Sequence, residues 1–156
     1  VFLHPGFGAG GARYADFGLV NGLARLSDTT VALARMLYAG LPERFPGAKI
    51  IVAHGGGALP YALGRLVRNH LVNPNTTADP LPSFRRLYYD TIVFDEKALE
   101  FLVDKVGDLH VVLGSDYPFP IGDLAPREIL GRSQLTDTQQ ANILAAPQLS
   151  TGGTAS

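Results

Sequence analysis

The chain has 156 residues, of which 46% are hydrophobic and 17% charged, and it contains no cysteine. A chain of this length buries roughly 70% of the surface it exposes when unfolded, which predicts one globular domain. Disulfides and thiolate metal sites are excluded because both need cysteine. The net charge is −1 without a basic run, which argues against a nucleic-acid binder, and no apolar stretch approaches the roughly 20 residues of a membrane span. A cytoplasmic protein that acts on a small molecule is expected.

Four short apolar runs predict β-strands: Val1–Leu3, Lys49–Ala53, Leu87–Asp90 and His110–Gly114. None of them alternates cleanly between apolar and polar residues, which favours strands buried on both faces of a parallel sheet. The first run starts at residue 1 without any lead-in. This start suggests a piece of a longer protein.

The segments between these runs have helical spacing. The expected boundary residues are Ser27 or Asp28 and Pro42 for the first helix, Pro60 and Leu71 for the second, Asp95 and Gly107 for the third, and Thr136 for the start of the last. Residues 1–146 are expected to form the domain. Residues 147–156 have the composition of a linker and are expected to be loose.

A strand followed by a helix, repeated four times, predicts an α/β fold with a parallel sheet. A complete (β/α)₈ barrel needs about 250 residues, so four units amount to half of one. A small, open, doubly wound sheet is the alternative.

Polar residues follow all four predicted strands: His4, His54, Asp90 and Asp116. The carboxyl ends of parallel strands lie on one side of the sheet, so these side chains are expected to converge on one cavity. Two imidazoles and a carboxylate there could bind a divalent metal. The competing interpretation of each residue alone is a hydrogen-bonded histidine or an aspartate that caps a helix.

Three other features are expected to lie outside the chemistry. His110 begins its strand, at the far side from the site, and His70 falls in the last turn of a helix, where a cation is favoured. Residues 6–11 (GFGAGG) satisfy the dinucleotide-binding pattern GxGxxG. However, Asp28, the acidic residue about 20 positions further on, precedes a helix when it should end a second strand, which disfavours nucleotide binding.

Three motifs resemble those of the amidohydrolase-2 family, which includes the aminocarboxymuconate-semialdehyde decarboxylases. They are His4-Pro5, residues 51–57 (IVAHGGG) and residues 113–120 (LGSDYPFP). Residues 29–46 and 87–92 are similar to the family as well, so the resemblance covers about residues 1–145. It implies the C-terminal half, about four strand-helix units, of a metal-dependent-hydrolase-type (β/α)₈ barrel.

The resemblance also implies roles for individual residues. His4 would be a zinc ligand, His54 the general acid or base, and Asp116 a ligand or a proton partner of the water at the metal. Arg65 stands where the decarboxylases carry an arginine that holds a substrate carboxylate in the neighbouring subunit, so a homo-oligomer, such as a dimer, is implied. Gly55–Gly57 could allow substrate to approach closely or simply relax the loop.

The implied function is zinc-dependent, non-oxidative decarboxylation of a small carboxylated metabolite. A metal-dependent hydrolase of the same family is the first alternative, and a catalytically silent fragment or binding module is the second. Complete members of the family carry a His-x-His pair on their first strand, and this sequence has none. The isolated chain is therefore expected to be inactive and to bind zinc weakly.

Overall fold

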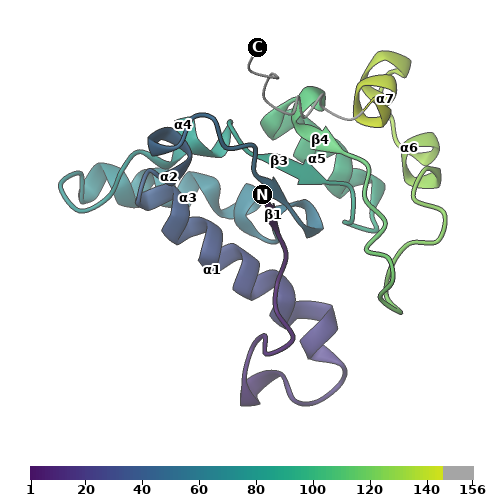
Figure 1. The fold of residues 1–156 in the computed structure, drawn as a ribbon, viewed down its shortest axis with the longest axis horizontal. Coiled ribbons are helices and arrows are strands. Elements are labelled where there is room, and N and C mark those ends of the chain that lie inside the picture. Colours follow the sequence, from purple (N-terminus) through teal and green to yellow (C-terminus); the bar gives the residue numbers. More distant parts are fainter. Residues whose placement is uncertain (146–156) are drawn as a thin grey trace, which may run out of the picture.

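The sheet consists of four short parallel strands in the order β1-β2-β3-β4 (Figure 1). The computed structural model describes residues 1–145; the expectation of a loose segment at 147–156 lies outside them. The strands are β1 (Phe2–Leu3), β2 (Ile51–Val52), β3 (Tyr88–Asp90) and β4 (Val111–Val112). Each lies within one of the four predicted runs, so the expected α/β class is confirmed.

The order of the strands separates the two expected architectures. In a doubly wound sheet the strand order reverses at a switch point, which places helices on both faces. Here each strand pairs only with its neighbours in the chain, for example through Ala53 N–H, which donates to the Leu3 carbonyl at 3.0 Å. This succession is that of a segment of a (β/α)₈ barrel.

Seven α-helices lie among the described residues: α1 (Arg25–Tyr38), α2 (Leu41–Arg44), α3 (Leu59–Val72), α4 (Pro80–Phe84), α5 (Glu96–Val106), α6 (Glu128–Arg132) and α7 (Asp137–Leu144). A π-helical segment, Val20–Ala24, leads directly into α1. None of the helices among residues 1–145 has the length and apolar character that crossing a membrane requires.

Most of the predicted helix boundaries are confirmed. Asp95 caps α5 by accepting from Ala98 N–H, and Thr136 caps α7 with a reciprocal capping box. The predicted start of the first helix is wrong, since α1 begins at Arg25 and continues the π-helical segment. The Ser27 hydroxyl donates to the Leu23 carbonyl, four residues back, so it is bonded within the helix and caps nothing.

The core lies between one face of the sheet and the helices. Val52, Tyr89 and Val111 point to this face and are fully buried against Leu33 of α1 and Leu99 of α5. Burying such side chains stabilises the fold by about 1.5–3 kcal/mol each.

The other face of the sheet is not covered by helices in the described residues. Ile51, Asp90 and Val112, the alternate residues of the same strands, line a cavity of about 450 Å³ there, and Phe2 is 59% exposed. The expectation of burial on both faces is confirmed for β4 and for Tyr89 and Asp90 of β3, which are buried. It is wrong for β1, where Phe2 is exposed, and for Ile51 of β2, which is only half-buried. Strands of two or three residues are too short for an alternating pattern to be visible in the sequence.

Residues 6–11, which satisfy GxGxxG, are followed only by the single 3₁₀ turn Ala12–Tyr14. A pyrophosphate site needs the N-terminus of a helix at that point. The nucleotide-binding alternative therefore has no structural support.

Candidate active site

His4, His54 and Asp116 come together although more than a hundred residues separate the first from the last. His4 follows β1, His54 follows β2, and Asp116 lies in the loop after β4. One ligand atom from each side chain lies within 4.8 Å of the others. The predicted convergence of these three strand ends is therefore confirmed.

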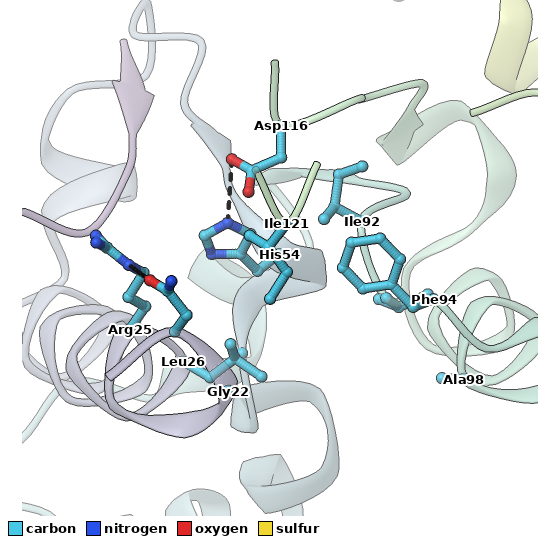
Figure 2. Close-up of a pocket in the computed structure, with 12 residues that line it drawn as sticks. Gly22, Arg25, Leu26, His54, Ile92, Phe94, Ala98, Asp116 and Ile121 are labelled. Carbon is cyan, nitrogen blue, oxygen red and sulfur yellow. Dashed lines mark hydrogen bonds and ion pairs between the residues drawn. The ribbon is translucent and has the colours of Figure 1, made fainter. Parts of the chain in front are cut away.

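Asp116 is the centre of this cluster. Its Oδ1 lies 3.2 Å from His4 Nε2 and 3.5 Å from His54 Nε2. The Asp116 and His54 side chains are 8% exposed and that of His4 is 22% exposed. Figure 2 shows His54 pointing at the Asp116 carboxylate from below. The three side chains thus form a compact and nearly buried polar group.

The His4 ring presents a lone pair to this group. Its Nδ1 lies 3.0 Å from the carbonyl oxygen of Pro5, which can only accept a hydrogen bond. The neutral ring therefore carries its proton on Nδ1, and Nε2 has a lone pair that faces Asp116 Oδ1. Two electron-donating atoms this close favour a cation between them, so the donor set fits a divalent metal.

An aromatic side chain fixes the orientation of His4. The Phe119 ring stacks on the imidazole with 5.4 Å between centroids and 7° between planes. Phe119 belongs to the same loop as Asp116. This loop therefore supplies both the carboxylate and the surface that holds one imidazole.

His54 stands at the start of a left-handed turn. Its φ is 56°, and Gly55, Gly56 and Gly57 follow with φ of 58°, 81° and 63°. Asp116 also has a positive φ of 55°. Non-glycine residues in this region cost about 1 kcal/mol or more, and such strain concentrates at functional sites.

The three glycines serve protein packing in this structure. A Cβ on Gly57 would lie 2.6 Å from the Leu26 carbonyl oxygen of α1, and one on Gly55 would lie 2.5 Å from Val93 Cγ1. Of the two predicted roles of these glycines, the loop role is the one with contacts in the structure. The turn brings α1 against His54 and thereby builds one wall of the site.

A cavity of about 340 Å³ opens beside His54 and Asp116 (Figure 2). Cavities of a few hundred Å³ with mostly apolar walls and few polar groups are typical of small-molecule sites. The apolar wall includes Leu26, Ile92, Phe94 and Ile121. The cavity is therefore suited to a small, partly apolar molecule.

Arg25 lines the same cavity and was not predicted from the sequence. The helical pattern in the sequence starts only after Arg25, which therefore falls in a predicted loop. The π-helical segment before it has no recognisable sequence signal, so the position of Arg25 could not be predicted. The only hint in the sequence is a cation that directly follows an uncharged stretch, residues 17–24.

Asp90 is not a member of the metal-binding group, but it lines the cavity of about 450 Å³ together with His4 and Asp116. Its Oδ1 accepts hydrogen bonds from Gly55 N–H at 2.9 Å and Ile92 N–H at 3.1 Å. Asp90 thus ties the left-handed turn at His54 to the end of β3. Burial raises the pKa of the Asp90 carboxyl, although the hydrogen bonds from Gly55 and Ile92 act in the opposite direction.

The raised pKa of Asp90 predicts a pH-dependent stability. A carboxyl whose pKa is higher in the folded than in the unfolded state contributes stability below the unfolded pKa of about 4, and loses it as the pH rises through the folded pKa. Asp90→Asn keeps an oxygen acceptor for Gly55 and Ile92 and removes the titration. In urea unfolding of the metal-free proteins from about pH 4 to about pH 7, the variant should therefore gain stability relative to the wild type as the pH rises. Parallel pH profiles would contradict this account.

The remaining predicted residues lie outside the cluster. Arg65 is exposed on α3 and does not line the cavity beside His54. His70 bonds to the Thr77 hydroxyl, and His110 bonds to the Leu87 carbonyl at the opposite ends of the strands. The predictions that His70 and His110 are structural are consistent with these contacts.

Curated proteins with similar sequences are decarboxylases and a hydratase. The chain is 33% identical over 150 residues to the 2-amino-3-carboxymuconate-6-semialdehyde decarboxylase of Dictyostelium discoideum, which covers 92% of this chain and 42% of that protein. It is 41% identical to the enzyme of the same name from Caenorhabditis elegans over 103 residues, which are 63% of this chain and 26% of that protein. A 2-keto-4-carboxy-3-hexenedioate hydratase from Sphingobium is 30% identical over 98 residues, 62% of this chain and 28% of that protein.

Solved structures support the architecture. The 5-carboxyvanillate decarboxylase of Sphingomonas paucimobilis has a TM-score of 0.76 and 25% identity, with 91% of this chain and 45% of that chain covered. A dihydroxybenzoic acid decarboxylase from Polaromonas, solved with manganese and the inhibitor 2-nitroresorcinol, has a TM-score of 0.74 and 20% identity, with 94% and 48% covered. The chain thus spans less than half of these proteins, and the expected half of a (β/α)₈ barrel is confirmed.

The sequence pattern of the amidohydrolase family matches residues 1–146, which include all the residues that the structure describes. This match agrees with the cluster at the strand ends and with the relatives named above. The chain therefore belongs to the amidohydrolase family.

Proposed function

We propose that the protein is a metal-dependent, non-oxidative decarboxylase of a small carboxylated, unsaturated metabolite. The observation that carries the proposal is the meeting of His4 Nε2 and Asp116 Oδ1 at 3.2 Å, with His54 in the same cluster. The names of the relatives from Dictyostelium and Caenorhabditis support the reaction class.

His4 and Asp116 would hold the metal, and zinc is the proposed ion. When bound, a divalent cation there would supply Lewis acidity, which stabilises negative charge that develops on a substrate oxygen. One nitrogen ligand from His4 and one oxygen ligand from Asp116 suit zinc and manganese alike. The Polaromonas relative was solved with manganese. Catalytic zinc sites use three protein ligands, so further donors are expected from outside residues 1–156.

His54 would move the proton. Its Nε2 lies 3.5 Å from Asp116 Oδ1, and His54 lines the wall of the cavity. In decarboxylation the bond between carbon and carboxylate breaks, its electron pair stays on the carbon, and carbon dioxide leaves. The Nε2 proton then passes to that carbon, which completes the replacement of CO₂ by hydrogen.

The apolar part of the cavity would exclude water from the carbanion. Leu26, Ile92 and Phe94 surround the space beside His54 (Figure 2). Electrostatic contacts are stronger where apolar side chains exclude water than in bulk water. The carbanion would then receive its proton from His54 and not from water.

The test is to measure metal content and gas release on the full-length protein. We expect bound divalent metal by mass spectrometry, and release of carbon dioxide from acids such as 2,6-dihydroxybenzoate or 5-carboxyvanillate. Removal of the metal with a chelator should abolish the release, and zinc should restore it. A protein without metal would support a silent binding module and contradict the proposal.

A hydratase or hydrolase is the second candidate, favoured by the similarity to the Sphingobium hydratase. In that reaction His54 could act as a base that takes a proton from a water molecule, and this water would then attack the substrate. Mass balance separates the reactions, since addition of water leaves the number of carbons in the acid unchanged. Product with one carbon fewer excludes this candidate.

Arg65 is proposed to bind a substrate carboxylate in a neighbouring subunit. It is exposed on α3 and does not line the cavity of its own chain, so this role requires a homo-oligomer. Arg65→Ala should raise KM for a carboxylated substrate about tenfold, with kcat little changed, because the contact exists in both ground and transition states. Steady-state kinetics and light scattering check the two parts. An unchanged KM, or a monomer, would contradict the role.

A further inference from the structure

We propose that Arg25, oriented by Asn21, binds a second anionic group of the substrate and thereby selects dicarboxylates over monocarboxylates. The inference rests on the proposed function, because it assigns the carboxylate that leaves to His54 and Asp116. The retained anionic group is assigned to Arg25, in addition to the Arg65 that the proposed function brings to it from a neighbouring subunit.

The position of Arg25 places its charge beside the reacting groups. It is the first residue of α1, directly after the π-helical segment Val20–Ala24. It lines the 340 Å³ cavity together with His54 and Asp116, and an adjoining cavity of about 220 Å³ together with His4. Figure 2 shows Arg25 across the cavity from Ile92 and Phe94. A π-helical turn is rare and frequently marks a functional site.

The guanidinium of Arg25 is held in place but lacks an anionic partner. Its Nε donates to Asn21 Oδ1 at 2.8 Å, and one terminal nitrogen donates to the Gly6 carbonyl at 3.2 Å. The Phe7 ring lies 5.8 Å below it. Among residues 1–145 it takes part in no ion pair. The other N–H groups of the guanidinium remain for a carboxylate, which it binds best as a two-point contact.

Arg25 is partly exposed and lines the cavity, so an anion can reach its guanidinium. Its two hydrogen-bond partners, the Asn21 side chain and the Gly6 carbonyl, are neutral. A carboxylate would supply the opposite charge that these partners lack. Because those partners fix the side chain, little rotational entropy is lost when the anion binds.

The anion bound by Arg25 must be one that stays in the product. The carboxylate that leaves as carbon dioxide loses its charge in the transition state, so a strong contact with it would favour the ground state and slow the reaction. A contact with a second carboxylate is equally strong in both states and lowers KM. The apolar wall formed by Leu26, Ile92 and Phe94 accepts the carbon skeleton between the two groups.

Two acids that differ only in the second carboxylate test the proposal: 5-carboxyvanillate and 2-hydroxy-3-methoxybenzoate. Both keep the carboxylate beside the ring hydroxyl. Dissociation constants are measured by calorimetry on the full-length protein in a His54→Ala background, so that no turnover disturbs the titration. We expect the dicarboxylate to bind more tightly, and Arg25→Met to weaken its binding about 10- to 100-fold while the monocarboxylate changes little.

The matched control is Arg35→Met on the same helix. Arg35 is exposed, lies in none of the cavities described, and should leave both dissociation constants unchanged. Arg25→Lys, which keeps the charge but loses the two-point geometry, should fall between the wild type and Arg25→Met.

The outcomes distinguish this inference from the proposed function. If Arg25→Met weakens both acids equally or neither, or if 5-carboxyvanillate does not bind at millimolar concentration, the inference is wrong even when the wild type releases carbon dioxide. If the selective loss is seen but the wild type releases no carbon dioxide from any acid, the anion site stands and the decarboxylase proposal fails.

Discussion

Replacing His54 with alanine is expected to lower kcat of the full-length enzyme by about 10²–10⁴-fold, the usual contribution of a positioned acid or base. Metal content should stay near that of the wild type, because His4 and Asp116 are the proposed ligands. Mass spectrometry of the bound metal and kinetics on the same preparation check both parts. Decarboxylation needs a proton delivered to carbon, and His54, whose Nε2 lies 3.5 Å from Asp116 Oδ1, is the proposed donor.

His4→Ala is the informative comparison. Its Nε2 faces Asp116 Oδ1 at 3.2 Å, so its loss should remove metal and activity together. His110→Ala, far from the cluster and bonded to the Leu87 carbonyl, controls for the general loss of an imidazole. Loss of metal in the His54 variant with retention in the His4 variant would reverse the two roles.

Gly57→Ala is expected to destabilise the fold by about 3 kcal/mol. The φ of 63° strains any residue with a Cβ, and the added carbon would lie 2.6 Å from the Leu26 carbonyl and 2.7 Å from the Thr30 hydroxyl. The Leu26 carbonyl is part of the α1 backbone and cannot move without shifting the helix. The Thr30 hydroxyl could turn away only by losing its hydrogen bonds with the Leu26 carbonyl and Ala58 N–H. Denaturant unfolding measures the loss.

Gly64→Ala gives the opposite sign and serves as the matched control. Gly64 lies inside α3, with no other atom within 4 Å of an added Cβ. Alanine in a helix interior is more stable than glycine by about 1 kcal/mol. If Gly57→Ala were as stable as the wild type, the close packing of α1 on the turn would not be needed for the fold.

The convergence of His4, His54 and Asp116 could be predicted from the sequence because it follows from topology. A polar residue directly after a buried parallel strand has only one side of the sheet to occupy, whatever the course of the loops. The caps at Asp95 and Thr136 were predictable for a similar reason, because each depends on hydrogen bonds within three residues.

The features that could not be predicted depend on contacts distant in the sequence. The start of α1 was missed because Ser27 carries a capping signal that a π-helical turn overrides, and the same turn determines where Arg25 points. From the sequence alone, the glycines after His54 are equally consistent with close approach of a substrate and with a relaxed loop. Their role became visible only when Leu26 and Val93 were seen beside them.

The left-handed backbone at His54 and Asp116 bears on how this protein evolves. Each of these residues destabilises the fold by about 1 kcal/mol relative to a glycine with the same φ. A lineage released from selection for activity would gain stability by replacing either residue with glycine or asparagine. A histidine and an aspartate kept at these two angles therefore distinguish copies under selection for catalysis from copies that retain only the fold.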